Sequence, residues 1–155
     1  MKEIYSDLFQ LAKTGQFTHC CITTNGFVKS NGECVMGRGC AKTIADMHPN
    51  IPKILGASIK KRGNVPCILH TQDNVKFISF PVKHKWFENA DIELIVKSAL
   101  NVSKRVGLNA KVLLPRPGCG NGNLNWNVVK KHLEDILDER FFIVHHTEGE
   151  GEQHD

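Results

Sequence analysis

Met36-Gly37-Arg38-Gly39-Cys40-Ala41 is the most informative stretch of the sequence. It comes after an apolar run predicted to be a strand, His19 to Thr24, and a polar insertion, and it opens a predicted helix, Cys40 to Met47. Glycines let the backbone turn tightly and approach a ligand closely. The helix N-terminus beyond them offers unpaired N–H groups and the positive end of a dipole. The stretch therefore predicts an anion-binding loop.

A second glycine-rich stretch, Pro117-Gly118-Cys119-Gly120-Asn121-Gly122-Asn123, stands in the same position relative to its neighbours. It follows a predicted strand, Lys111 to Leu114, and precedes a predicted helix, Trp126 to Leu137, for which Asn125 is the expected N-cap. In open α/β folds, ligands bind at the carboxyl edge of the sheet, where both loops should lie. Two such loops can hold the two phosphates of a diphosphate from opposite sides.

The glycines alone leave other interpretations open. Each loop could be an ordinary turn between a strand and a helix. The spacing does not match the GxGxxG dinucleotide fingerprint, and the Lys-Ser/Thr pair of a Walker loop is absent after the glycines. The common nucleotide motifs are therefore not met, and the loops by themselves indicate only an anion site.

Apolar segments alternate with helical patterns along the chain and predict a three-layer α/β/α sandwich with a mixed central sheet. The strands are apolar on both sides, as expected where helices cover both faces of a sheet. The predicted strands are Ile4 to Leu8, His19 to Thr24, Val65 to Thr71, Val75 to Phe80, Lys111 to Leu114 and Phe141 to His145. The predicted helices are Cys40 to Met47, Ile51 to Lys61, Asp91 to Val106 and Trp126 to Leu137.

Length and composition indicate a single domain. The 155 residues carry a formal charge of +4, which suits an anionic ligand but is too weak to identify a nucleic-acid binder. We expect one domain over residues 1–146 and a disordered acidic tail over 147–155. The N-terminus lacks a signal peptide and no window is long enough for a membrane span, so a cytoplasmic, monomeric protein is expected. The six cysteines are expected to be free thiols, and no metal site is expected.

At these loops the sequence resembles a macrodomain, a family that binds ADP-ribose. The resemblance runs from about Ile4 to His145 and lies in the order of several short elements more than in any one of them. These elements are Ser6-Asp7-Leu8, Thr23-Thr24-Asn25, Val35-Met36-Gly37-Arg38-Gly39-Cys40-Ala41-Lys42, Leu114-Pro115-Arg116-Pro117-Gly118-Cys119-Gly120 and Leu124-Asn125-Trp126.

Within that family the chain is most similar to the branch that hydrolyses ADP-ribose from DNA or glutamate, which includes the antitoxin partners of DNA ADP-ribosyltransferase toxins. The similar segment is Phe80-Pro81-Val82-Lys83-His84-Lys85-Trp86, and the resemblance implies that Lys83 is catalytic. A nucleophilic amine needs a lowered pKa, and Lys85, two residues further on a strand, is expected to help lower it. Alternatively, Lys83, His84 and Lys85 form a solvated basic loop.

Two departures from the family pattern bear on the chemistry. The insertion from Gly26 to Cys34 lengthens the first loop and is expected to reshape the entrance to the distal ribose. Gly122 stands where some relatives that cleave protein esters carry a catalytic aspartate, which favours nucleic-acid-linked ADP-ribose as the substrate. Trp86 and Phe87 beside the lysines could stack a base of such a substrate, or they could be rim or core residues.

The resemblance implies an ADP-ribosyl hydrolase that needs no cofactor and acts on modified nucleic acid. The alternatives are a phosphatase acting on ADP-ribose 1″-phosphate and a module that binds ADP-ribose without turnover. Asp7 would bind the adenine, although it could instead cap a helix or a turn. The implied catalytic residues are Lys83 and Asn25, the latter at the distal ribose. The implied binding residues are Asp7, Leu8, Met36, Gly37, Arg38, Gly39, Cys40, Gly118, Cys119, Gly120, Asn121, Gly122, Asn123 and Leu124.

Overall fold

The computed structural model describes residues 1–146, and the expected tail over 147–155 lies outside them. The strands are β1 (Lys2–Tyr5), β2 (His19–Asn25), β3 (Ile68–Gln72), β4 (Val75–Lys83), β5 (Val112–Pro115) and β6 (Phe141–His145). The helices are α1 (Leu8–Ala12), α2 (Gly39–Met47), α3 (Ile51–Arg62), α4 (Ile92–Arg105) and α5 (Trp126–Leu133).

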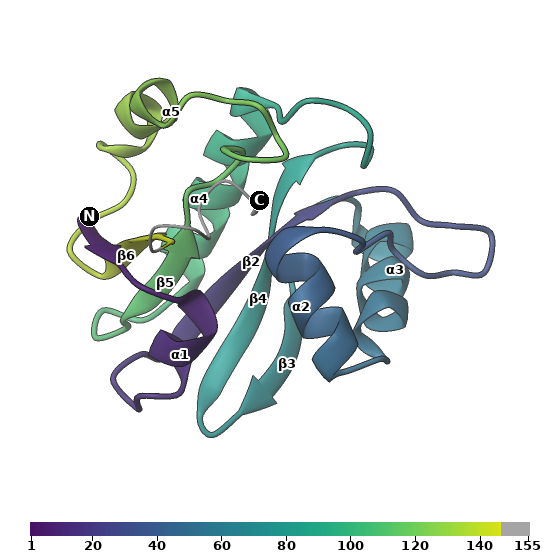
Figure 1. Ribbon diagram of the computed structural model, residues 1–155, viewed down its shortest axis with the longest axis horizontal. Helices are drawn as coiled ribbons and strands as arrows, with labels where there is room; N and C mark the ends of the chain where they lie inside the picture. Colours follow the sequence, from purple (N-terminus) through teal and green to yellow (C-terminus); the bar gives the residue numbers. More distant parts are fainter. Residues whose placement is uncertain (147–155) are drawn as a thin grey trace.

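A six-stranded sheet in the order β1-β6-β5-β2-β4-β3 forms the middle layer. Every neighbouring pair is parallel except β3 and β4, which are antiparallel, so the sheet is mixed, as predicted. Helices α1 and α2 lie in front of the sheet in Figure 1, and α4 lies behind it. This arrangement confirms the predicted α/β/α sandwich.

Alternation along the strands divides the core between the two faces of the sheet. In β2, Cys20 and Ile22 pack with α1, α2 and α3, whereas Cys21 packs with α4 and α5. Successive side chains of a strand point to opposite faces, so a central strand with helices on both sides is apolar throughout. Because the sheet is parallel at its centre, the carboxyl ends of β2, β4 and β5 reach the same edge.

The predicted strand from Ile4 to Leu8 is wrong in its second half. Strand β1 ends at Tyr5, and Leu8 is the first residue of α1. Asp7 is the N-cap of this helix, and its carboxylate accepts a hydrogen bond from the Gln10 amide at 2.9 Å. A helix of 5 residues is too short to show a 3.6-residue period in the sequence, which is why α1 was not predicted.

Three other boundaries differ from the prediction for identifiable reasons. Strand β3 begins at Ile68 and not at Val65, because Pro66 cannot donate to a sheet. Strand β4 continues past Phe80 to Lys83 and therefore includes Pro81. A proline is tolerated there because β3 pairs with β4 only as far as Ile78, so the missing N–H of Pro81 is not needed by β3. Helix α5 ends at Leu133, and a turn follows over Glu134 to Ile136.

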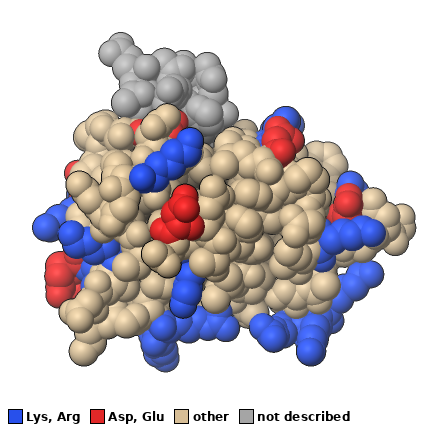
Figure 2. Space-filling view, turned by 90° about the horizontal axis from the view of Figure 1, so that it is seen from below, with Lys and Arg blue, Asp and Glu red and all other residues tan. Residues whose placement is uncertain are grey.

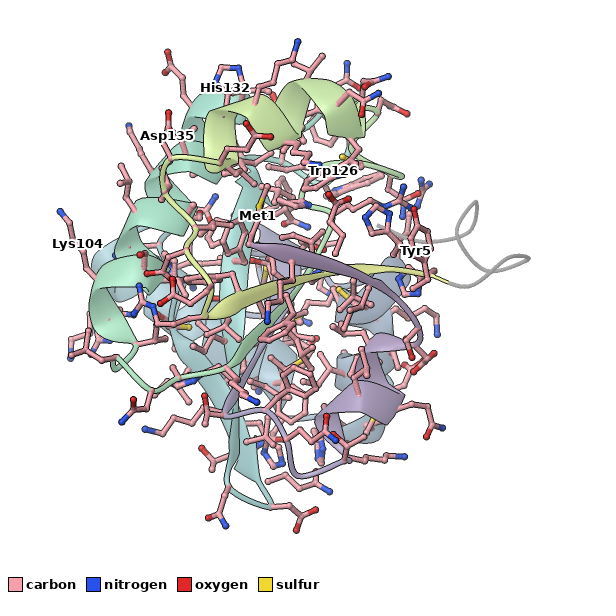
Figure 3. The ribbon with its side chains drawn as sticks, turned by 90° about the vertical axis from the view of Figure 1, so that its left-hand side faces the viewer. Met1, Tyr5, Lys104, Trp126, His132 and Asp135 are labelled. Carbon is pink, nitrogen blue, oxygen red and sulfur yellow. The ribbon has the colours of Figure 1, made fainter. Side chains whose placement is uncertain are left out.

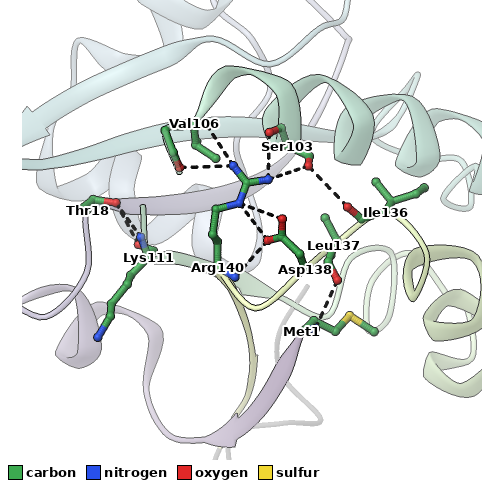
Figure 4. Close-up of polar contacts among 10 residues, drawn as sticks. Met1, Thr18, Ser103, Val106, Lys111, Ile136, Leu137, Asp138 and Arg140 are labelled. Carbon is green, nitrogen blue, oxygen red and sulfur yellow. Dashed lines mark hydrogen bonds and ion pairs between the residues drawn. The ribbon is translucent and has the colours of Figure 1, made fainter. Parts of the chain in front are cut away.

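Arg140 ties the end of α4 to the start of β6. Its guanidinium donates to the carbonyl oxygen of Ser103 at 3.1 Å and to that of Val106 at 3.0 Å, and Asp138 accepts from its Nε at 2.8 Å (Figure 4). The carbonyls at a helix C-terminus have no partner within the helix, so a guanidinium that donates to them stabilises the helix end.

A polar network at the β1 edge of the sheet joins β1, β6 and α5 around the Glu3 carboxylate. Lys130 Nζ donates to Glu3 at 2.5 Å, Trp126 Nε1 at 3.1 Å and His145 Nε2 at 2.7 Å. Trp126 lies at the start of α5 (Figure 3) and meets the His145 ring edge-on. The hydrogen bond from Lys130, opposed by burial and assisted by Trp126 and His145, lowers the pKa of Glu3 to about 2.

We expect Glu3 to stabilise the protein at neutral pH and to lose this effect in acid. A carboxyl whose pKa is depressed in the folded state stabilises it above the ordinary pKa and less and less as the pH falls toward the folded value. Glu3→Gln should therefore lower the free energy of unfolding at pH 7 by about 1–2 kcal/mol after solvent screening. Urea denaturation should show this difference narrowing between pH 5 and pH 2. Glu139→Gln, at an exposed position, is the control, and an equal loss in both variants would contradict the prediction.

Membrane-spanning helices, clusters of metal ligands and disulfides do not occur in the described residues. No helix in residues 1–146 is both long enough and apolar enough to cross a membrane. The same residues contain no group of three or more His, Cys, Asp or Glu side chains able to hold a metal ion. All six cysteines lie in these residues, are buried and form no disulfide, and burial raises the pKa of the Cys34 thiol to about 12.

Candidate functional site

A cavity of about 540 Å³ opens at the carboxyl ends of β2 and β4, between the two glycine-rich loops. The sequence-predicted site residues on its wall are Asn25, Met36, Gly37, Arg38, Lys83, Asn121 and Gly122. The two loops lie more than 80 positions apart in the sequence, yet both reach this cavity. The prediction that they converge on one site is therefore confirmed.

The first loop has backbone amides without an acceptor beside the cavity. Helix α2 has Arg38 as its N-cap, and no side chain accepts a hydrogen bond at this cap. In residues 1–146 the amides of Gly37, Arg38 and Gly39 donate to no acceptor. Gly39 has a φ of 59°, a left-handed conformation that glycine adopts without strain. These amides and the positive end of the α2 dipole favour an anion at this place.

Some backbone amides of the second loop form internal hydrogen bonds, and others have no acceptor. The amides of Asn123 and Leu124 donate within the loop, to Gly120 O and Gly118 O, each at 3.0 Å. Within the described part of the chain, the amides of Gly120, Asn121 and Gly122 have no acceptor. Of the loop residues expected to bind the phosphates, Cys119 and Asn123 thus use their amides inside the loop, donating to Arg116 O at 3.3 Å and to Gly120 O at 3.0 Å.

Gly122 is fixed by close packing. A Cβ atom added to it would lie 2.4 Å from the Gly118 carbonyl oxygen and 2.8 Å from Ala90 Cβ. Real Cβ atoms do not approach other atoms this closely, so no larger residue fits without moving the loop. This backbone accordingly excludes an aspartate at position 122.

Lys83 is the last residue of β4, and its half-buried side chain reaches under the second loop. Its Nζ donates to Asn121 O at 3.0 Å and to Trp86 O at 3.3 Å. Burial, followed by the positive charge of Arg38, lowers the pKa of the Lys83 amine. A desolvated lysine beside another cation is the usual arrangement for a nucleophilic amine.

Lys85 does not have the role that was expected for it. Strand β4 ends at Lys83 and the chain turns, so the two lysines do not share a strand face. Lys85 is exposed and lies over the Phe87 ring, 5.9 Å from its centroid. The cation that acts on Lys83 is Arg38, on the other side of the cavity.

Asn25 braces the inserted segment from Gly26 to Cys34. Its Nδ2 donates to Val35 O and its Oδ1 accepts from the Phe27 amide, both at 2.9 Å. The insertion forms a small hairpin, closed by a bridge between Val28 and Cys34. Asn25 thereby ties the two ends of the hairpin together while lining the cavity.

The hairpin folds back onto α3. A Cβ added at Gly56 of α3 would lie 1.9 Å from Gly32 O, so only glycine permits this approach. As a result Phe27 and Lys29 form part of the cavity wall. The sequence suggested that the insertion reshapes the entrance, but it gave no signal for these two residues.

The remaining predicted residues lie away from the cavity. Leu8 is completely buried in the core, and Asp7 caps α1. Cys119, Gly120 and Leu124 line a neighbouring hollow of about 480 Å³, together with Tyr5, Arg116 and His145. Gly39, Cys40, Gly118 and Asn123 belong to the loops but not to the cavity wall.

Solved structures share this architecture over nearly the whole chain. The macrodomain of Thermus aquaticus DarG matches with a TM-score of 0.71 at 21% identity, covering 95% of this chain and 97% of that one. The macrodomain of Mycobacterium tuberculosis DarG matches with a TM-score of 0.66 at 21% identity, over 92% and 97%. The chain has the macrodomain fold.

A further match is to Thermosipho africanus DarTG in complex with ADP-ribose, with a TM-score of 0.72 at 20% identity. It covers 93% of this macrodomain, which spans 41% of the length of that chain. No family model and no curated protein matches the sequence. At these identities the likeness establishes the fold, and the chemistry has to be argued from the site of this macrodomain itself.

Proposed function

We propose that the cavity binds ADP-ribose and that the protein removes ADP-ribose from a modified nucleic-acid base. The observation that carries this proposal is the position of Lys83, a desolvated amine held between two loops of unused amides. The cavity volume of about 540 Å³ lies within the range of small-molecule sites. The ADP-ribose complex of the similar DarTG structure supports the choice of ligand.

The two loops account for recognition of the diphosphate. The amides of Gly37 and Arg38 on one wall of the cavity, and those of Asn121 and Gly122 on the other, have no acceptor in the described residues and would donate to the phosphates. Hydrogen bonds from amides to a phosphate are charge-assisted and contribute about 1.5–3 kcal/mol each. Asp7 remains our proposal for the adenine contact, through the carboxylate oxygen that does not cap α1.

Lys83 accounts for turnover. Its neutral nitrogen bonds to C1″ of the distal ribose as the bond from C1″ to the base breaks, and the base leaves with the proton that the amine gives up. Opening of the ribose ring converts the adduct to an imine. Water then adds to the imine carbon, which releases ADP-ribose and restores the amine. Asn25 lies beside this position and binds the ribose hydroxyls.

Trp86 favours a base over a protein side chain as the leaving group. It lines the cavity and is 46% exposed, so much of its surface is open to a ligand. Stacking of a base on an aromatic ring contributes about 1–3 kcal/mol. The absence of room for an aspartate at Gly122 also fits a mechanism that relies on the lysine alone.

The test is incubation with a single-stranded oligonucleotide carrying ADP-ribosylated thymine or guanine, followed by mass spectrometry. We expect the unmodified oligonucleotide and free ADP-ribose as products. Phosphate release from ADP-ribose 1″-phosphate, without cleavage of the modified DNA, would replace the proposal by a phosphatase. Calorimetry showing ADP-ribose binding with no turnover of either substrate would replace it by a binding module.

A further inference from the structure

A second hollow, of about 530 Å³, lies at the opposite edge of the sheet from the candidate site. It occupies the part of the α4 face that α4 leaves uncovered, over β3 and β4 and beside α3. Its floor is aliphatic and includes Ile68, Ile78 and Val106. Ile68 is 53% exposed, so this floor is open to solvent.

Basic side chains surround this floor. Lys61 and Arg62 come from the last turn of α3, Lys76 from the start of β4 and Arg105 from the last turn of α4. The residues that line the hollow include no carboxylate. None of the ion pairs found in residues 1–146 includes any of these cations. Lys and Arg side chains gather along the lower margin of Figure 2, on the α4 side, with few acidic ones among them.

Stabilisation of helix ends explains the presence of only some of the basic side chains around the hollow. Lysine and arginine in a last turn interact favourably with the helix dipole, which suffices for Lys61, Arg62 and Arg105. Lys76 and His19, however, stand at the starts of strands, where no such dipole exists. Burial and then the positive charge of Lys76 lower the pKa of His19, so the strand side of the rim also lacks a compensating anion.

Two polar groups of the hollow are held ready for a ligand. Arg105 Nη1 donates to Pro66 O at 2.8 Å, which fixes the guanidinium at the rim. The Ser58 hydroxyl is buried on the wall and has no hydrogen-bond partner in the described part of the chain. A buried hydroxyl without a partner is costly. Because this oxygen is closed to solvent, a phosphate or base could bond to it only after a small movement of the wall, which would relieve that cost.

We infer that this hollow binds single-stranded nucleic acid, with phosphates on the basic rim and an unpaired base on the aliphatic floor. The cations come from separate elements around the floor, which suits successive phosphates of a strand better than one compact anion. The inference deepens the proposed function by naming a second contact with its substrate. Lys76 and Lys83 stand at the two ends of β4, about 23 Å apart at the usual rise per residue, or roughly seven nucleotides at duplex spacing.

Fluorescence anisotropy with an unmodified single-stranded 20-mer tests the inference independently of hydrolysis. The triple variant Lys61→Glu, Arg62→Glu and Lys76→Glu should bind at least about tenfold more weakly. Its affinity should also depend less on salt. The slope of the logarithm of the binding constant against the logarithm of the salt concentration should be smaller in magnitude by about 2, since each lost phosphate contact removes about 0.7. All three side chains are exposed, and thermal unfolding checks that the fold is retained.

The matched control is the triple variant Lys13→Glu, Lys97→Glu and Lys131→Glu, at exposed positions outside the hollow. It makes the same change in net charge and should retain most of the affinity. Equal losses in the two variants would show attraction by net charge only and would overturn the inference. An undiminished affinity in the first variant would overturn it as well.

Two further measurements test the floor and separate this inference from the proposed function. Ile68→Ser should weaken binding of the 20-mer but not that of an abasic strand of equal length, while equal binding of duplex and single strand would overturn the role of the floor. Calorimetry with ADP-ribose should give the same affinity for the wild type and the hollow variant. If the wild type does not bind ADP-ribose, the proposed function is wrong, but the result on binding of the single strand is unaffected.

Discussion

Lys83→Ala should reduce the rate of ADP-ribose release from modified DNA on the order of 10²–10⁴-fold, the range for a group that acts directly on the reacting bond. The affinity for ADP-ribose should stay within about threefold, because in the proposed complex the loop amides, and not Lys83, hold the diphosphate. The side chain is half-buried and its nitrogen is held by Asn121 O and Trp86 O, so no other amine can take its place. Single-turnover kinetics and calorimetry measure the two quantities separately.

Lys85→Ala is the matched control, since the Lys85 side chain is exposed and its ammonium lies over the Phe87 ring, away from Lys83. Its rate should stay within about twofold of the wild type. Should Lys83→Ala retain the wild-type rate, the amine mechanism would be wrong. A loss of ADP-ribose affinity equal to the loss of rate would make Lys83 a binding residue only.

The pH dependence of the reaction distinguishes a nucleophile from a structural lysine. The rate should rise with pH through the pKa of Lys83, because only the neutral amine attacks C1″. Burial and Arg38 depress this pKa. Arg38→Gln removes a positive charge and favours the protonated amine, so the midpoint of the profile should move to higher pH. An unchanged midpoint would mean that Arg38 does not tune the nucleophile.

The sequence was sufficient to predict the convergence of the two glycine-rich loops. Each follows a parallel strand and precedes a helix, and the carboxyl ends of parallel strands meet at one edge of the sheet. Their residues therefore meet although Gly37 and Gly122 are far apart along the chain. The choice of Lys83 came from the family resemblance, since its neighbours in sequence suggest only a basic loop.

Contacts between segments far apart in the chain could not be predicted from the sequence. The hairpin after Asn25 lies on α3 because Gly56 admits the Gly32 carbonyl, and neither glycine indicates its partner. Arg38, and not Lys85, is the cation beside Lys83, because β4 ends at Lys83, two residues short of Lys85. For Asp7 the sequence allowed two roles, adenine binding and capping of a helix or turn. The structure shows the cap, a hydrogen bond from the Gln10 amide to the Asp7 carboxylate.

Gly122→Ala should lower the affinity for ADP-ribose by at least about 2 kcal/mol, or roughly 30-fold. The new Cβ would meet Gly118 O at 2.4 Å and Ala90 Cβ at 2.8 Å, so the loop has to move. The free N–H groups of the loop then no longer point toward the proposed phosphate position, and Asn121 O moves away from Lys83. Gly107→Ala, whose Cβ meets no atom within 4 Å, is the control and should bind normally in calorimetry. If Gly122→Ala binds as tightly as Gly107→Ala, the second loop does not hold the diphosphate and the recognition argued from both loops fails.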